Sequence, residues 1–170
     1  MLRTAVETFA ARGYYGTTTT EVATRAGISQ AYVYRLFPNK EALFLAVVAH
    51  AYDLVRDSLA RGAAAATSTA PLDVLYAMGD SYARLIQDKN LMLIQLHAQA
   101  AAVAEPAVRD AVRVGYARVV EYVRSTSGAS EPEVQQFFAT GLLCHLIVAI
   151  DADHIDAPWA RALSAGIRHF

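Results

Sequence analysis

Two short helix-forming segments joined by a glycine turn lie near the start of this 170-residue chain, and they restrict its fold more than any other feature. Thr18 and Glu21 fit a Thr-x-x-Glu capping box, in which each side chain satisfies a free backbone amide at a helix start. Gly27 is placed to end that helix, because glycine enters the left-handed conformation without steric cost. Ser29 is a cap for a second helix, which Pro38 stops. The pattern predicts a helix-turn-helix.

The outer side of the second helix carries residue types that contact DNA. Val33 and Phe37 lie four residues apart and are expected to face the core, with Leu36 helping to seal it. On the remaining surface, a glutamine amide can form hydrogen bonds with an adenine edge and an alanine methyl group can contact a thymine methyl group. Tyrosine hydroxyls and the Arg and Lys cations can bind phosphates. The candidate DNA contacts are Thr18, Thr19, Ser29, Gln30, Ala31, Tyr32, Tyr34, Arg35 and Lys40. On two capped helices alone, an ordinary helical hairpin remains an alternative.

A longer run of residues, 5–47, resembles the DNA-binding domain of the TetR family of transcriptional repressors. The similarity keeps the family's spacing without a gap and includes Phe9-Ala10, Gly13-Tyr14, Thr17-Thr18, Val22-Ala23, Ala26-Gly27-Ile28-Ser29, Tyr34, Phe37, Lys40-Glu41 and Leu43-Phe44. Two positions differ: Gln30 stands where the family often has a basic residue, and Ala31-Tyr32 replaces a frequent Gly or Ala-Thr pair. The resemblance therefore implies a DNA-binding repressor without implying its operator sequence.

Charge is distributed unevenly along the chain. Residues 1–50 hold five Lys or Arg against three Glu, a net charge of +2, whereas the whole chain has a net charge of -1. The near-neutral total argues against a protein that coats nucleic acid, and it gives dimer geometry more weight than bulk charge. The single cysteine, Cys144, excludes an internal disulfide and suits a reducing cytoplasm. Without a visible signal peptide or an apolar run of roughly 18 residues, we expect a cytoplasmic protein that does not bind membranes.

The rest of the chain predicts helices and no strands. The expected helices run from Asn39 to about Leu59, over 72–87, 91–103, 107–126 and 130–150, and from Pro158 onward, with a loop over 62–71. We predict an all-α protein of about nine helices. Residues 1–47 would form a three-helix DNA-binding domain, with the helix-turn-helix at about 18–37, and residues 48–170 a helical effector-binding and dimerisation domain.

The helix ending at Ile150 is apolar on every side from Phe137 onward, and such a helix must be buried all round. The other helices of a single chain can bury only one side of this helix. The resemblance implies a partner for the other, because in the TetR family the last two helices pair with their copies across a twofold axis. We expect a homodimer through residues 132–150 and 158–168. The expected contacts are Phe137, Leu143 and Ile147, with Trp159, Leu163 and Ile167 as one helical stripe. A monomer with this helix wholly internal is the alternative.

The resemblance also implies control by a small molecule. In the family, an effector fills a cavity in the larger domain, and the linking helix, here 39–59, moves the two readers out of register with the DNA. The candidate lining residues are Tyr82, Ile86, Met92, Gln95, Leu96, Gln99, Tyr116, Val120, Phe138, Leu142 and His145. This mixture suits a largely apolar effector with one or two hydrogen-bonding groups, although such residues also serve as ordinary core.

A cluster of potential metal ligands raises a competing class, a metal-dependent hydrolase. The cluster consists of Cys144, His145, Asp151, Asp153, His154 and Asp156. His145 lies in an apolar helix, the aspartates fall in a loop where they would cap and be solvated, and no spacing matches a ligand signature. We therefore expect no catalytic residue, no metal and no cofactor. A helical interaction module that does not bind DNA is the third hypothesis.

Overall fold

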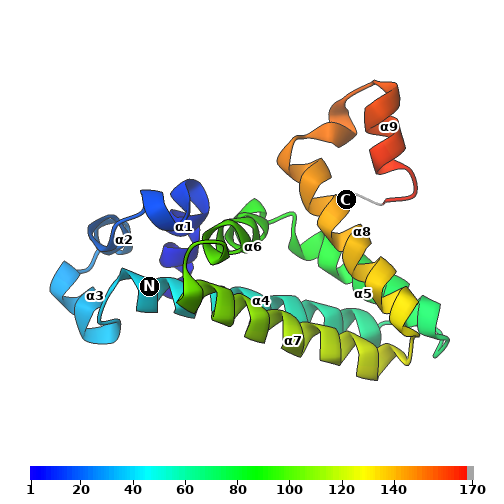
Figure 1. Cartoon of the computed structure of the whole chain (residues 1–170), viewed down its shortest axis with the longest axis horizontal. Helices are drawn as coiled ribbons and strands as arrows, with labels where there is room; N and C mark the ends of the chain where they lie inside the picture. The colour runs from blue at the N-terminus through cyan, green and yellow to red at the C-terminus, as the bar shows by residue number, and fades with distance from the viewer. Residues whose placement is uncertain (168–170) are drawn as a thin grey trace. The chain divides into compact units, whose positions relative to one another are not determined.

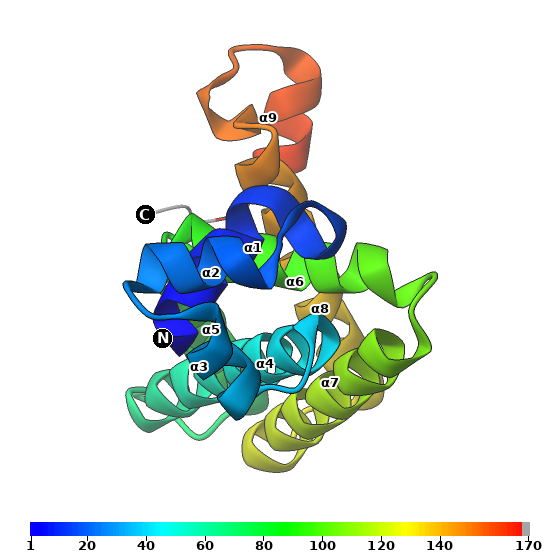
Figure 2. The ribbon, with the colours of Figure 1, turned by 90° about the vertical axis from the view of Figure 1, so that its left-hand side faces the viewer.

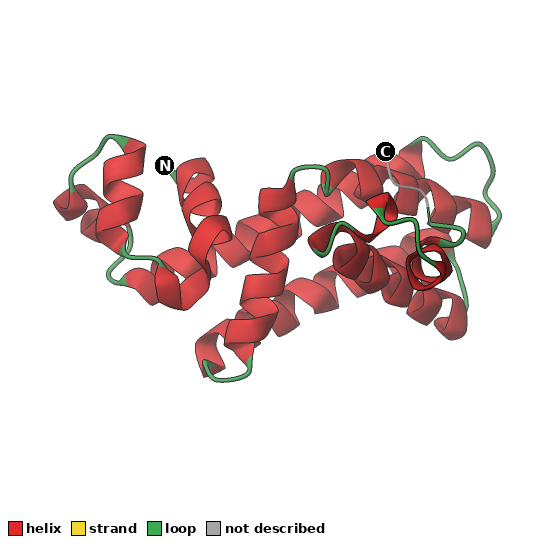
Figure 3. Cartoon of the chain, turned by 90° about the horizontal axis from the view of Figure 1, so that it is seen from above, coloured by secondary structure: helices red, strands yellow, loops and turns green. Residues whose placement is uncertain are grey.

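The structure, a computed structural model, describes residues 1–167, and these form nine α-helices and one 3-10 turn without a β-strand (Figures 1 and 3). The predicted all-helical class is confirmed. The helices are α1 (Leu2–Gly16), α2 (Thr19–Ala26), α3 (Gln30–Leu36), α4 (Lys40–Ala64), α5 (Pro71–Leu85), α6 (Lys89–Ala102), α7 (Pro106–Ser127), α8 (Glu131–Ala149) and α9 (Pro158–Ser164), with the 3-10 turn η1 (Ala152–His154) before α9. Among the described residues, no helix is both long and apolar enough to cross a membrane.

Contacts divide the chain into two compact units. Unit 1 consists of Met1–Leu54 and Asp88–Val119, and unit 2 of Val55–Gln87 and the chain from Val120 onward. The helices α4 and α7 therefore each contribute to both units. The boundary expected after residue 47 lies inside the unbroken helix α4, and it stays a prediction about function.

Aromatic side chains form the core that holds the first helices of unit 1 together. The Phe9 ring of α1 lies 4.9 Å from the Phe44 ring of α4, and the Tyr14 ring lies 5.0 Å from the Phe44 ring. Val22 of α2 and Val33 of α3 are fully buried, one on each helix of the helix-turn-helix. Burying a side chain of this size contributes about 1.5–3 kcal/mol, so one apolar position is enough to fix the orientation of the short α3.

Helix α1 is broken at Gly13, where it contacts α6 within unit 1. Gly13 has φ +69° and ψ −174°, a conformation that L side chains rarely adopt. A Cβ atom built on Gly13 would lie 2.8 Å from Nδ1 of His97, and Nε2 of His97 lies 3.1 Å from the carbonyl oxygen of Ala10. The break therefore lets the α6 histidine sit directly against the α1 backbone.

Helix α4 extends to Ala64, past the expected end near Leu59, so the loop expected from residue 62 starts later. Gly62 lies inside the helix because it serves packing rather than a turn. A Cβ atom built on it would lie 2.5 Å from the Ala77 carbonyl oxygen of α5. Nearby, the Ser58 hydroxyl donates to the Ser81 carbonyl oxygen at 2.9 Å, and small residues thus bring α4 and α5 close together in unit 2.

The last helix is shorter than the sequence predicts. Pro158 occupies its first turn as expected, but α9 ends at Ser164. Gly166 follows with φ +75°, a left-handed conformation that interrupts the helix. Trp159, Leu163 and Ile167 therefore do not form one helical stripe, since Ile167 lies beyond the helix end. The expected interface over 158–168 also includes residue 168, which lies outside the described residues.

Candidate nucleic-acid interface

The start of α2 and the turn after it have the geometry that the sequence indicates. The backbone amide of Glu21 donates to the Thr18 hydroxyl at 3.2 Å, and the Thr18 amide donates to the Glu21 carboxylate at 2.9 Å. These bonds from the Thr18 amide and hydroxyl lower the pKa of Glu21, and Arg12 pairs with the same carboxylate at 2.7 Å. Gly27 is left-handed, with φ 66° and ψ 29°. The reciprocal cap and the glycine fix where α3 begins.

Helix α3 follows α2 through a short turn (Figure 2). It buries one side chain and exposes most of the others. Ser29 caps it by accepting the Tyr32 amide at 3.1 Å, and Val33 is fully buried. The exposed positions are Gln30, Ala31, Tyr32, Tyr34 and Arg35. The expectation that Leu36 seals the core is wrong, because Leu36 is 46% exposed. Helix α3 ends at Leu36, and the backbone becomes extended at Phe37. As a result Phe37, and not Leu36, is partly buried.

Three polar side chains link the two helices of the motif. The Thr19 hydroxyl donates to the Tyr34 hydroxyl oxygen at 3.1 Å, and the Gln30 amide lies 3.3 Å from the Thr19 oxygen. The Gln30 amide also reaches the Tyr34 oxygen at 3.5 Å. Because a hydroxyl accepts two hydrogen bonds and donates one, this arrangement leaves the Tyr34 proton for an acceptor outside the protein. Thr19 is only 6% exposed, so its place is beneath the surface that Gln30 and Tyr34 form.

The two cations expected near DNA have different surroundings. The Arg35 guanidinium carbon lies 4.7 Å from the centre of the Tyr32 ring, and both side chains are exposed. Lys40 instead donates to the Tyr14 carbonyl oxygen at 3.0 Å, and its nitrogen lies 4.6 Å from the centre of the Tyr14 ring. Lys40 thus ties the start of α4 to the end of α1, a role that the sequence did not indicate, whereas Arg35 is held on the outer face.

The predicted effector-pocket residues fall in both units, and the structure pairs some of them within each. In unit 1, the Gln99 amide donates to the Tyr116 hydroxyl at 3.0 Å, and burial raises the pKa of Tyr116. Met92 and Gln95 are buried there, and Leu96 is partly exposed. The unit 2 members are Tyr82, Ile86, Val120, Phe138, Leu142 and His145. Of these, the Tyr82 hydroxyl lies 2.5 Å from Nε2 of His145.

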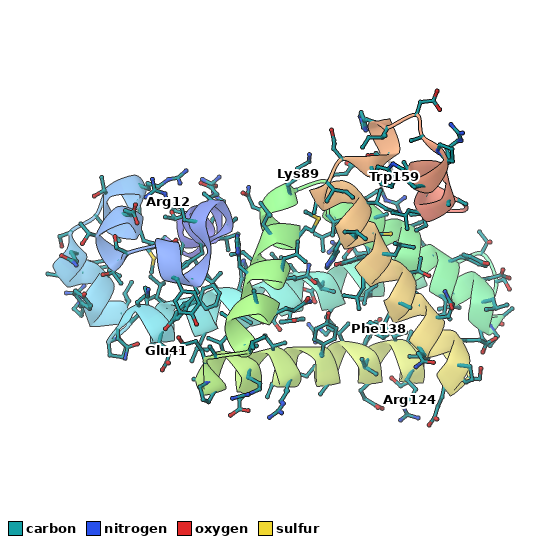
Figure 4. All side chains as sticks on the ribbon, turned by 45° about the horizontal axis from the view of Figure 1, so that its top comes forward. Arg12, Glu41, Lys89, Arg124, Phe138 and Trp159 are labelled. Carbon is teal, nitrogen blue, oxygen red and sulfur yellow. The ribbon has the colours of Figure 1, made fainter. Side chains whose placement is uncertain are left out.

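The exposed apolar face of α8 differs from the face expected to form a dimer. Leu142, Leu146 and Ile150 are 46–47% exposed and follow each other at intervals of four residues. Ile147, which the sequence placed in the interface, is fully buried within the chain, and Leu142, placed in the pocket, is on the open side. A helix that is apolar all round gives no periodic signal to tell these faces apart. Phe137, Leu143 and Leu163 are partly exposed. Trp159 of α9 is exposed (Figure 4).

The loop after α8 brings three of the potential metal ligands together at the surface. Ligand atoms of Asp151, Asp153 and His154 lie within 4.8 Å of one another, and all three residues are exposed. His145 is not part of this group, since it is buried on α8 with Nε2 next to Tyr82. Exposed acidic groups of this kind are common without an ion.

Comparisons with known proteins agree with this geometry. Residues 1–47 match the family model of the bacterial regulatory proteins of the tetR family. No curated protein matches the sequence. Among solved structures, FadR from Bacillus subtilis, a transcriptional regulator solved in complex with stearoyl-CoA, has 19% sequence identity and a TM-score of 0.70, over 98% of this chain and 97% of that chain.

Two further structures have the same fold. The fatty acid degradation regulator FadR from Bacillus halodurans has 19% identity and a TM-score of 0.67, over 99% of this chain and 95% of its own. PfmR from Thermus thermophilus, a TetR family transcriptional regulator, has 18% identity and a TM-score of 0.67, over 96% of this chain and 92% of its own. The family model that matches residues 1–47 describes bacterial regulatory proteins, which favours the DNA-binding hypothesis over the hydrolase hypothesis. Residues 1–47 therefore match the N-terminal domain of the tetR family of bacterial regulatory proteins, and the chain shares its fold with solved transcriptional regulators of the TetR family.

Proposed function

We propose that this regulator binds a near-palindromic DNA operator as a homodimer and is released from it by a small, largely apolar effector. The outer face of α3 carries the proposal. It presents an amide, two phenols and a guanidinium to solvent on a helix that a left-handed glycine, the Ser29 cap and a buried valine hold in place. Such groups suit a helix that enters the major groove.

In this proposal the residues of the motif have distinct roles. Gln30 and Ala31 contact base edges, because they lie in the first turn of α3, and Tyr32, Tyr34 and Arg35 contact phosphates. The caps Thr18 and Ser29 keep the helix starts in position near the backbone of the DNA. Thr19 orients Gln30 and Tyr34 from below, and Lys40 acts mainly by holding α4 against α1.

The stripe of Leu142, Leu146 and Ile150 on α8 supports the dimer. A row of half-exposed apolar side chains over about two helical turns, ending at the residue that caps α8, is unfavourable in water and marks an interaction surface. Trp159 on α9 adds an exposed aromatic side chain to unit 2. We propose that this stripe meets its copy across a twofold axis, with Phe137, Leu143, Trp159 and Leu163 at its margins.

We propose that the effector is an acyl compound or a molecule of similar apolar character. FadR from Bacillus subtilis, which shares the fold, was solved with stearoyl-CoA. The expected lining residues that lie in unit 2 are mainly apolar, and they include the polar pair Tyr82 with His145. A long apolar ligand with one polar group fits that composition.

Selection of DNA by the purified protein tests the proposal. We expect repeated selection from a random duplex library to enrich one inverted repeat, and we expect Gln30→Ala to change the preferred base within each half-site. Tyr76→Ala on α5, where the side chain is exposed far from α3 in sequence, serves as the matched control and should select the wild-type repeat. Enrichment of no common sequence by the wild-type protein would contradict the proposal.

A further inference from the structure

A buried nitrogen of unit 2 has no hydrogen-bond partner. His145 on α8 is only 3% exposed, and its Nδ1 atom makes no hydrogen bond within the described residues. Nearly all buried polar groups in folded proteins are hydrogen-bonded, since desolvation without a partner costs free energy. This exception lies among the residues expected to line the effector site.

The contact on the other side of the ring determines what Nδ1 offers. Nε2 of His145 lies 2.5 Å from the Tyr82 hydroxyl. The phenol is the stronger acid of the two groups, so it donates to Nε2, and the proton of the neutral imidazole is then on Nδ1. Burial lowers the pKa of His145 to about 4, so the ring is uncharged at neutral pH. Nδ1 is therefore an uncharged N–H donor.

Space next to this pair is indicated by Gly141. It lies four residues before His145, on the same face of α8. A Cβ atom built on Gly141 would have Tyr82 Cε1 as its single near neighbour outside the helix backbone, at 4.0 Å. A Cβ atom built on Gly79 of α5, in the same helix pair, would likewise make an ordinary contact, with the Phe137 ring at 3.6 Å. Gly141 is also partly exposed, so a small group can be accommodated beside Tyr82 on the face of α8 that carries Gly141 and His145.

We propose that Gly141, Tyr82 and His145 form the polar end of the effector site, where Nδ1–H of His145 donates to the carbonyl oxygen of an uncharged ketone, ester or thioester. This inference rests on the proposed function, in which an effector binds among the helices of the larger domain. An uncharged donor favours a neutral acceptor over a carboxylate, because it does not compensate the desolvation of an anion. Gly141 leaves room for the chain next to the carbonyl.

Binding of simple eight-carbon probes, measured by NMR without DNA, tests the inference. We expect the wild-type protein to bind 2-octanone at least about fivefold more tightly than octanoate, and the His145→Phe variant to lose about five- to tenfold in affinity for 2-octanone, as for removal of one hydrogen bond. Gly141→Val should block the ketone, whereas Gly79→Ala, the matched control, should bind it like wild type. Equal affinities for the two probes, or no binding of 2-octanone, would overturn the proposal.

A second measurement does not depend on a variant that folds. The ¹⁵N spectrum of the histidine rings reports which nitrogen carries the proton. We expect His145 to be the Nδ1–H tautomer, with its Nδ1 resonance shifted by 2-octanone, and an Nε2–H tautomer would overturn the assignment. Ketone binding by a protein that selects no operator would count against the proposed function alone, so the two failures are distinguishable.

Discussion

Tyr34 is the residue at which the internal hydrogen bonds of the motif meet its outer surface. Its oxygen accepts from Thr19 and Gln30, and its own proton is directed to an outside acceptor in our proposal. Tyr34→Phe should weaken binding to every operator sequence by about three- to tenfold, because a hydrogen bond to phosphate carries no sequence information. Fluorescence anisotropy at fixed salt measures this effect. Tyr76→Phe is the control, and an unchanged affinity for Tyr34→Phe would exclude the phosphate contact.

His145 links the stability of unit 2 to pH. The pKa of His145 is about 4 in the folded chain, below the ordinary value of 6.5. The unfolded chain therefore binds the proton first, and the folded state loses stability as pH falls from about 6.5 to about 4, by up to about 3 kcal/mol. Urea unfolding at pH 7 and at pH 5 measures the loss. The His145→Phe variant should lose less between these values, and an identical loss in both proteins would argue against a buried neutral ring.

Some residue roles were predictable from the sequence and others were not. Thr18, Gly27 and Ser29 act through local backbone geometry, which neighbouring residues determine, so their roles follow from the sequence. The contact of Lys40 with Tyr14 and the burial of Ile147 depend on packing between helices far apart in sequence. A uniformly apolar α8 has no periodicity to reveal its buried side. The pairing of Tyr82 with His145 has no sequence signal for the same reason.

At the scale of helices, Gly62 allows α4 and α5 to approach each other closely. Gly62→Ala should destabilise the protein by about 1–3 kcal/mol, since the new Cβ atom would lie 2.5 Å from the Ala77 carbonyl oxygen and 2.7 Å from the Met78 Cα atom. Gly79→Ala, also in a helix, should be neutral or stabilising by up to about 1 kcal/mol, because its Cβ atom would make an ordinary contact at 3.6 Å. Thermal unfolding compares them. Equal stabilities would show that α4 and α5 do not pack through Gly62.

The same glycine explains why element boundaries were harder to predict than element types. Glycine and proline near residues 62–71 favour a loop by local rules, and the loop begins only after Ala64 because Gly62 is used for packing. In α9, the reverse occurs: a helix expected to continue ends at Ser164, before the left-handed Gly166. The presence of the helices was predictable from the spacing of apolar residues. The ends of α4 and α9 depend instead on tertiary contacts and on the conformation of single residues.

At the scale of the whole molecule, the function proposed here requires two copies of the chain. Leu146→Glu introduces a charge in the middle of the α8 stripe and should convert the dimer to a monomer, which would also lose operator binding. Light scattering coupled to size exclusion measures the mass. Leu72→Glu on α5 is the matched control, because Leu72 is similarly exposed and lies outside the stripe. A Leu146→Glu protein that remains dimeric would place the interface elsewhere.

The distance between the two α3 helices in the DNA complex tests the central claim most directly. A spin label at Leu36→Cys, in a Cys144→Ala background, sits at the exposed end of α3 and outside the proposed DNA contacts. Pulsed electron resonance on the protein bound to its selected operator should give one intersubunit distance of about 35 Å, the separation of successive major grooves on one side of the duplex. The effector should shift or broaden it. The absence of any intersubunit distance in the bound state, or one far from a helical repeat, would contradict the account.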